Sequence, residues 1–313
     1  MHVQAWVTVC MQMMHGMDHI VVYEPDQRAR LGFVLSWKAM IENVVNSREL
    51  IWQLFKRDLL AGSKQSVLGI LWIVISPLVG IVSWVLMNEA GVLHPGALDI
   101  PYPLYVLFGT AIWGLFMAFY SAAASSLTSV GGLLVQAKFS HEALVAQQMA
   151  HTVIVVIVNV LLLLSVWGIF GATFHWSVLL FPFSLIPMFL LGTGIGMVVS
   201  VFAVLIRDMT KTITTLLGLA MFMTPVVYAA DVQSAWLQRL IAWNPLTYLV
   251  GGARDLVLQG RIGYPARYAV SVLLAATVFL VAWRLFFMQC DGWPFRPRPE
   301  RSDLSMSSWE PVP

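Results

Sequence analysis

The sequence predicts an all-α integral membrane protein with six transmembrane helices. Only 11% of its 313 residues are charged and 59% are hydrophobic, whereas soluble domains carry about 25% charged residues. A helix needs about 20 apolar residues to cross the hydrocarbon core of a bilayer. Five long stretches contain no Asp, Glu, Lys or Arg, and the longest has room for two helices separated by the small and polar residues 171–176.

These stretches define one transmembrane domain at residues 47–290. We expect its spans at residues 65–88, 103–127, 145–170, 178–204, 212–230 and 267–288. Residues 1–46 and 291–313 then form an N-terminal and a C-terminal tail. In the fourth span, Gly192, Gly194 and Gly196 offer a face of small residues that another helix could approach closely.

The distribution of positive charge predicts a multi-pass protein of the cytoplasmic (inner) membrane with both termini in the cytoplasm. An even number of spans puts both termini on one side, and fourteen of the eighteen Lys and Arg residues fall on that side. Cytoplasmic loops carry an excess of positive residues. The other face receives only Arg239, Arg254, Arg261 and Arg267. Cys10 and Cys290 then lie in a reducing compartment, where a structural disulfide is not expected.

An amphipathic helix is expected on the cytoplasmic side before the first span. Asn46 followed by Glu49 matches a capping box, and apolar residues then recur at helical spacing up to Gly62. This pattern predicts a helix from Ser47 to about Ala61. Its polar face carries Lys56 and Arg57, so the helix fits a position along the membrane interface. A juxtamembrane packing helix is the alternative interpretation.

A short helical hairpin is expected on the outer side before the last span. Residues 235–243 and 246–258 are two apolar pieces, neither long enough to span a bilayer, and Asn244-Pro245 separates them. Proline is tolerated at the start of a helix and pushes the preceding residue out of the helical region. The pattern predicts a hairpin that dips into the outer leaflet, with a periplasmic helical loop as the alternative.

Several function classes lose support from the sequence. There is no basic tract for nucleic acid and no phosphate-binding Gly-x-x-x-x-Gly-Lys-Ser/Thr motif. His141-Glu142 lacks the second histidine of a zinc protease, and no other metal site is indicated. The spans contain essentially one ionisable side chain, His151, which disfavours coupling to an ion gradient. Energy for active transport must therefore come through the cytoplasmic loops from a partner ATPase.

Three groups of residues resemble a known family of permeases. Residues 54–59 (LFKRDL), residues 64–72 (KQSVLGILW) and Pro77-Leu78 are similar to the entry segment of ABC-type polysaccharide or polyol phosphate exporters. This family serves O-antigen, capsule and teichoic acid export. The resemblance covers roughly residues 47–290 and continues through Gly132-Leu133-Leu134, Lys138-Phe139, Arg207-Asp208, residues 224–228 (TPVVY) and Asn244-Pro245. Gly131-Gly132 and Phe139-Ser140-His141 depart from the usual family pattern.

The resemblance implies a transport subunit without enzyme activity. Such a permease forms a homodimer, binds two copies of a separate ABC ATPase, and moves a glycan attached to a lipid. ATP and Mg²⁺ would bind to the partner, and no cofactor is expected in this chain.

The resemblance also implies roles for particular residues. The ATPase-coupling loop would contain Lys138, Phe139, His141 and Glu142. The interface helix, with Lys56, Arg57, Asp58 and Lys64, would control entry of the lipid-linked substrate, because its positive face suits the phosphate of a lipid carrier. The aromatic candidates for contact with the sugar chain are Trp72, Trp84, Phe222 and Tyr228, and Asn244 with Pro245 would form the turn of the outer hairpin.

Each group of residues also has an alternative interpretation without a role in transport. The coupling loop could be a solvated loop, the positive helix a topological anchor, and the aromatic residues a lipid-facing belt. Two other functions also stay open at this point. One is an ABC permease for a drug or a lipid, and the other is a membrane-embedded enzyme that acts on lipid-linked sugars.

Overall fold

The computed structural model describes residues 32–64, 71–92, 96, 100–128, 141–170, 175–206, 208–229 and 234–289, and all regular elements in these ranges are helices. The elements are α3 (Phe33–Asn46), α4 (Arg48–Lys64), α5 (Leu71–Glu89), α6 (Tyr102–Ser125), α8 (His141–Ile169), the 3-10 helix η1 (Trp176–Leu180), α9 (Phe181–Ser184), α10 (Ile186–Leu205), α11 (Met209–Ala220), the 3-10 helix η2 (Met221–Met223), α12 (Ala235–Trp243), α13 (Pro245–Leu258) and α14 (Pro265–Gln289).

Four helical segments of the described chain are long and apolar enough to cross a membrane. They are Tyr102–Ser125, Glu142–Ile169, Trp176–Leu205 and Pro265–Met288. They match the predicted spans at residues 103–127, 145–170, 178–204 and 267–288. The third of these segments runs through η1, α9 and α10 in succession.

The other two predicted spans correspond to shorter apolar helices. For the predicted span 65–88, residues 65–70 lie outside the described residues, and the apolar helix covers Val74–Glu89. For the span 212–230, the helix ends at Met223, so the prediction of helix from residue 224 onward is wrong. Thr224 is extended, with φ −114° and ψ 133°, because the following Pro225 disfavours the helical conformation before it and has no amide hydrogen of its own.

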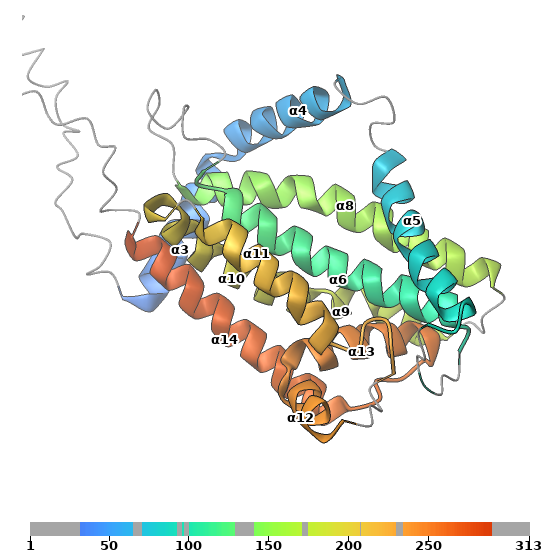
Figure 1. Cartoon of the computed structure of the whole chain (residues 1–313). Helices are drawn as coiled ribbons and strands as arrows, with labels where there is room; N and C mark the ends of the chain where they lie inside the picture. The colour runs from blue at the N-terminus through green and yellow to red at the C-terminus, as the bar shows by residue number, and fades with distance from the viewer. Residues whose placement is uncertain are drawn as a thin grey trace, which may run out of the picture.

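α6 and α10 form the centre of the bundle (Figure 1). In the most apolar 18 residues of each spanning segment, the buried share of residues is 72% for α6 and 61% for the segment that contains α10. The corresponding shares are 33% for α14 and 22% for α8. A Cβ atom at Gly196 would lie 2.5 Å from the carbonyl oxygen of Tyr120 in α6. A Cβ atom at Gly194 would lie 3.1 Å from Phe279 in α14. The predicted small-residue face of the fourth span is therefore confirmed for Gly192 and Gly196, which face α6, whereas Gly194 lies on another side of α10 and faces α14.

Helix α3 lies within the range that the sequence analysis assigned to the N-terminal tail. Its Trp37 packs on Trp283 of α14, with 4.3 Å between ring centroids. Trp283 Nε1 donates to the Met40 sulfur, and Arg284 donates to the Ser36 hydroxyl. Residues 33–46 therefore belong to the packed bundle, and this corrects the tail boundary at residue 46.

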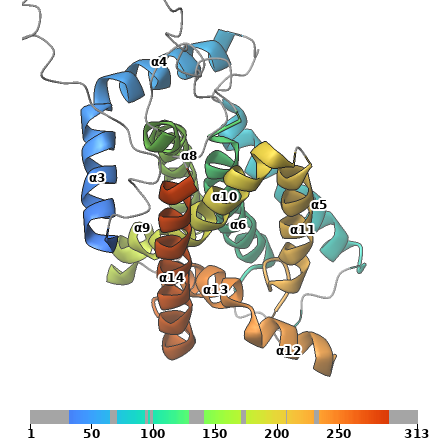
Figure 2. The same cartoon turned by 90° about the vertical axis from the view of Figure 1, so that its left-hand side faces the viewer.

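The two ends of the molecule differ in their elements. Helix α4 crosses one end of the bundle, and α12 and α13 lie at the opposite end (Figures 1 and 2). Helix α4 begins at Arg48, one residue after the predicted start at Ser47, and Asn46, the predicted cap, ends α3 instead. The location of α4 at a membrane interface remains a prediction.

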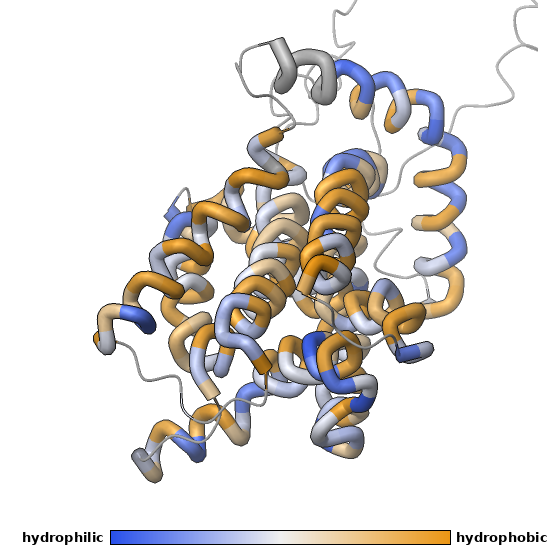
Figure 3. The backbone as a smooth tube through the Cα atoms, turned by 90° about the vertical axis from the view of Figure 1, so that its right-hand side faces the viewer, coloured by the Kyte–Doolittle hydropathy of each residue, from blue (hydrophilic) through white to orange (hydrophobic). Residues whose placement is uncertain are grey.

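Most of the helices between these ends are hydrophobic over much of their length (Figure 3). Exposed apolar side chains recur every four residues along α8, at Val153, Ile157 and Leu161, each more than 50% exposed. Such stripes suit contact with lipid or with another transmembrane helix.

Candidate transport groove and outer polar network

A groove with a volume of about 630 Å³ runs between α5, α6, α8 and the start of η2. Its lining includes two tryptophans, three glycines or alanines, and the polar side chains of Ser76, Thr110 and Asn159. Thr110 donates to the carbonyl oxygen of Val106 at 2.7 Å, and Asn159 donates to that of Val155 at 2.9 Å. Thr110 and Asn159 thus already donate within their own helices, and most of the remaining wall is aromatic and aliphatic.

Three of the four predicted channel aromatics gather at this groove. Trp72 and Trp84 line it from α5. Phe222 in η2 packs against Trp84, with ring centroids 6.3 Å apart and an interplanar angle of 57°. Tyr228 lies beyond the end of η2, where its hydroxyl donates to the carbonyl oxygen of Phe222 at 2.7 Å. The structure therefore brings together side chains from α5 and η2 that are about 140 residues apart in the sequence.

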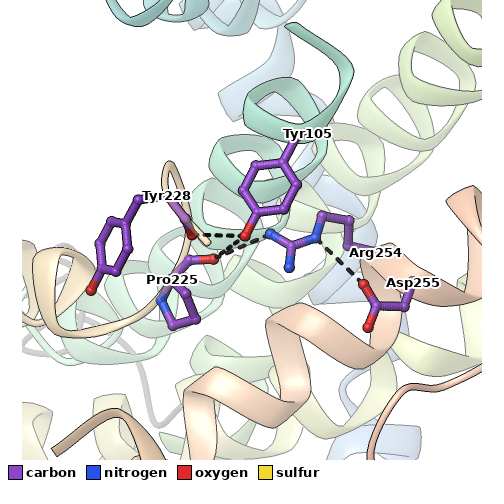
Figure 4. A network of polar contacts seen from close by, with 5 residues as sticks. All are labelled: Tyr105, Pro225, Tyr228, Arg254 and Asp255. Atoms are coloured by element: carbon purple, nitrogen blue, oxygen red, sulfur yellow. Dashed lines mark hydrogen bonds and ion pairs between the residues drawn. The ribbon is translucent and has the colours of Figure 1, made fainter. Parts of the chain in front are cut away.

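A polar network holds the non-helical segment that follows η2 (Figure 4). Arg254 of α13 is only 6% exposed, and its Nη1 donates to the carbonyl oxygen of Pro225 at 3.2 Å. Its guanidinium carbon lies 3.7 Å from the ring centroid of Tyr105 in α6, and its Nε lies 3.7 Å from Asp255 Oδ1. A buried cation is thereby placed between an aromatic face, a carbonyl and a carboxylate.

Two tyrosines of α6 cover further carbonyl groups of the same segment. The hydroxyl of Tyr105 lies within hydrogen-bonding distance of the carbonyl oxygens of Pro225 (3.2 Å) and Tyr228 (2.8 Å). The hydroxyl of Tyr102 donates to the carbonyl oxygen of Val227 at 3.2 Å. Buried backbone carbonyls need a partner once the chain leaves the helix. We refer to Tyr102, Tyr105, Arg254 and Asp255, together with residues 224–228, as the outer network.

The turn of the outer hairpin is tied to this network. Asn244 caps α13, since its Oδ1 accepts from the amide of Leu246 at 3.0 Å, and its Nδ2 donates to Thr224 Oγ1 at 2.8 Å. Pro245 occupies the first turn of α13, where its missing amide hydrogen costs nothing. The predicted break at Asn244-Pro245 is therefore present as the junction between α12 and α13.

Asp255 is the one carboxylate of the outer network. Burial raises the pKa of its carboxyl above the ordinary value of 3.8, and the charge of Arg254 and the amide of Gly263 offset only part of that rise. Desolvation disfavours the charged form of a carboxyl, whereas a nearby cation favours it. The direction of the shift shows that desolvation outweighs the ion pair at this position.

The predicted interface residues lie on α4. Lys56 and Arg57 are exposed, and Lys56 Nζ lies 5.0 Å above the ring of Trp52. Trp52 in turn stacks on Phe55, with ring centroids 5.4 Å apart. Asp58 and Lys64 also belong to α4, but their side chains lie outside the described residues. A second groove, of about 510 Å³, separates this helix from α8, with Arg48 at its border.

The predicted ATPase-coupling residues are only partly described. Lys138 and Phe139 lie outside the described residues, and so does the side chain of His141, which begins α8. Glu142 is buried in the first turn of the same helix, where a negative charge suits the positive end of the helix dipole.

Within the outer network, no site role was predicted from the sequence for Tyr102, Tyr105, Arg254 or Asp255. One signal was available, because Arg254 and Asp255 are the only charged residues within the otherwise apolar stretch 246–258. Charged side chains in such a stretch are usually paired and buried together. Their partner Tyr105 lies about 150 residues earlier in the chain, and no local pattern connects the two.

Comparison with known proteins gives a consistent result. The family model described as ABC-2 type transporter matches residues 49–258. An O-antigen export system permease protein of Myxococcus xanthus is 23% identical over 245 residues, which is 77% of this chain and 92% of that protein. A polysialic acid transport protein of Escherichia coli is 24% identical over 213 residues, or 67% of this chain and 81% of that protein. A Klebsiella pneumoniae O-antigen export system permease is 24% identical over 226 residues, or 69% and 83%. The chain belongs to the ABC-2 type transporter family.

Proposed function

We propose that this chain is the permease subunit of an ATP-driven exporter that moves a lipid-linked polysaccharide across the inner membrane. The observation that carries the proposal is the groove between α5, α6, α8 and η2, with Trp72 and Trp84 in its wall. Sugar rings have apolar faces that stack on aromatic side chains, and hydroxyl groups that need few fixed partners. An aromatic groove can therefore hold a sliding glycan loosely. Relatives named for O-antigen and polysialic acid export support this substrate class.

A separate ATPase supplies the energy in this proposal. The chain has no phosphate-binding loop, and its spans carry essentially no ionisable groups that could couple to an ion gradient. Two copies of the permease and two copies of the ATPase would make up the working exporter, with ATP and Mg²⁺ bound by the ATPase. Lys138, Phe139, His141 and Glu142 form the proposed contact with it.

Entry of the substrate is proposed at α4. The exposed Lys56 and Arg57 offer charge-assisted hydrogen bonds to the phosphate of a lipid carrier. Asp58 and Lys64 complete the polar residues proposed for this gate. In this arrangement α5 and α11 act as the first and fifth of six spans, both termini are cytoplasmic, and α12 with α13 dips into the outer leaflet.

Deletion of the gene tests the proposed function. We expect lipid-linked glycan to accumulate inside the cell and surface glycan to disappear, with both restored by the wild-type gene. The double variant Trp72→Ala with Trp84→Ala should restore export at least tenfold less well, because it removes both aromatic faces from the groove. Trp236→Ala, which removes an exposed tryptophan of α12, is the matched control and should restore export fully.

Other outcomes separate the competing functions. Normal surface glycan in the deletion strain would reject the proposal. Normal glycan combined with increased accumulation of a drug would favour an efflux permease. Turnover of lipid-linked sugar by the purified chain alone would favour a membrane-embedded enzyme.

A further inference from the structure

A pocket of about 310 Å³ lies between the outer hairpin and the start of α14. This volume is at the lower end of the range found for small-molecule sites. One water molecule occupies about 30 Å³ in the liquid, so the pocket is far larger than a single water needs. Polar side chains from three helices line it: Gln238 of α12; Thr247, Arg254 and Asp255 of α13; and Arg267 of α14. This lining is far richer in hydrogen-bonding groups than that of the groove beside α5.

Two buried polar atoms in the wall of this pocket lack hydrogen bonds. The Thr247 residue is only 8% exposed, and its hydroxyl makes no hydrogen bond to any described residue. A threonine inside a helix commonly donates its hydroxyl to the carbonyl oxygen four residues earlier. Thr247 lies in the first turn of α13, and the residue four positions earlier, Trp243, belongs to α12. Arg254 Nε is also without a hydrogen bond in the described chain. Buried polar atoms of this kind favour a partner that is bound from outside.

Aromatic side chains form the rim of the pocket. Tyr248 and Tyr264 both line it, with their rings 6.2 Å apart at an angle of 76°. Arg267 donates to the Tyr248 hydroxyl, which itself donates to the carbonyl oxygen of Ala242 at 2.8 Å. Because these bonds hold the Tyr248 ring in one orientation, it offers a fixed flat surface beside the polar wall.

The pocket borders the transport groove through one short segment. Met221 lines the groove and Pro225 lines the pocket, so five residues of chain reach from one cavity to the other. The outer network holds this segment in place. The walls of the two cavities are therefore joined by one short run of the chain.

We propose that this outer pocket is a second saccharide-binding site, which takes one hydroxylated sugar ring of the glycan as it leaves the groove. The inference rests on the proposed function. The Thr247 hydroxyl and the Gln238 amide donate to and accept from the sugar hydroxyls, and Arg254 Nε donates to one of them. The Tyr248 ring contacts the apolar face of the sugar.

Two arginines, Arg254 and Arg267, and one carboxylate, Asp255, line the pocket, and each already has a partner within the protein, which favours a neutral sugar ring over a phosphate or another anion. Arg254 already uses Nη1 for the Pro225 carbonyl and its planar face for Tyr105. The carboxylate of Asp255 lies 3.7 Å from Arg254 Nε and lines the same pocket. A bound anion would face this carboxylate at close range, and two like charges so placed repel each other.

The test uses the full-length chain in lipid nanodiscs and saturation-transfer NMR, which detects weak ligands. The probes are galactose, mannose, rhamnose and N-acetylglucosamine, each alone, and inorganic phosphate. We expect a signal from at least one sugar, no competition from phosphate, and at least a fivefold weaker sugar signal in Thr247→Val. This substitution keeps the shape of the side chain and replaces the hydroxyl with a methyl group. The matched control is Thr277→Val on α14, whose hydroxyl donates to the Leu273 carbonyl and is exposed, and its signal should equal that of wild type.

Three results would overturn the inference: no sugar signal from wild type, an equal signal from Thr247→Val and wild type, or displacement of the sugar by phosphate. The melting temperature of Thr247→Val is measured in parallel, so that loss of binding is not confused with loss of folding. The gene deletion described above tests the exporter itself. If deletion stops export while Thr247→Val binds sugar normally, the outer site fails and the proposed function stands.

Discussion

At the scale of single residues, Arg254 shows how a charge can be kept inside a membrane protein. A buried guanidinium is costly unless its charge is paired. Here the partners are the Tyr105 ring, the Pro225 carbonyl and the Asp255 carboxylate. In return, the arginine satisfies a carbonyl of a segment that cannot be helical after Thr224. The chain leaves the helix after η2, and the Pro225 carbonyl is hydrogen-bonded there by Arg254 from α13.

Replacing Arg254 should therefore destabilise the protein strongly. Arg254→Met removes the ion pair and the bond to Pro225 and leaves Asp255 without its cation, which should cost about 3 kcal/mol. We expect a clearly lower melting temperature in detergent, measured by intrinsic fluorescence. Arg239→Met, at an exposed arginine of α12, should melt within a degree or two of wild type. Equal melting temperatures for both variants would contradict the role assigned to Arg254.

Asp255 should make stability depend on pH. Because burial raises the pKa of its carboxyl above the ordinary value of 3.8, the folded state holds the proton more tightly than the unfolded state. The stability of wild type relative to Asp255→Asn should therefore fall as pH rises from 3.8 to the raised pKa, and stay constant above it. Melting curves of both proteins across that window test this, and a difference that grows with pH would refute it.

At the scale of elements, the contact between α6 and α10 depends on the absence of side chains. Within a bilayer, helices gain little from hydrophobic burial against each other, so close backbone packing supplies much of the association energy. Gly196 faces the Tyr120 carbonyl and the Ala123 methyl group, and Gly194 faces α14. One helix thereby joins two neighbours and forms the centre of the bundle.

Gly196→Ala should weaken this contact. The added methyl group would lie 2.5 Å from the Tyr120 carbonyl oxygen, and such overpacking costs about 1–3 kcal/mol. Gly218→Ala in α11 is the control, because nothing lies within 4 Å of its Cβ position and alanine favours a helix. We expect a lower melting temperature for the first variant and an unchanged or higher one for the second. The opposite order would mean that α6 and α10 do not pack in this way.

At the scale of the whole molecule, polar and charged elements separate to the two ends of an apolar bundle. The end with α4 presents Lys56 and Arg57, and the end with α12 and α13 contains the outer network and the sugar site proposed above (Figures 1 and 3). In the proposed function, the substrate enters beside α4 and leaves beside α13.

The orientation can be tested by cysteine labelling in intact cells. Cys10 and Cys290 are first replaced by serine, and single cysteines are then placed at Gln259 or Lys38, both exposed. A membrane-impermeant maleimide should label Gln259→Cys from outside and Lys38→Cys only after permeabilisation. Labelling of both positions from the same side would reject the proposed topology, because Gln259 and Lys38 would then lie on one face of the membrane.

The sequence by itself determined the long apolar helices to within a few residues, but it did not predict α3, which was assigned to the N-terminal tail. Long apolar runs predicted the spanning segments, and Asn244-Pro245 predicted the junction of α12 and α13, because both signals act over a few residues. The same local reasoning could have ended the fifth helix at Thr224, since Pro225 was visible in the sequence. The interface, coupling and channel roles of individual residues were predicted from a resemblance and remain predictions.

Only the tertiary structure decided which side chains complete the outer end. Tyr105 and Arg254 are about 150 residues apart, and they meet at the Pro225 carbonyl because α6 and α13 pack against the same non-helical segment. It also decided that the Thr247 hydroxyl lines a pocket without a hydrogen-bond partner in the described chain. The direction in which a helical side chain points depends on the rotation of its helix against its neighbours. That rotation is set by packing over the whole bundle, and no short stretch of sequence records it.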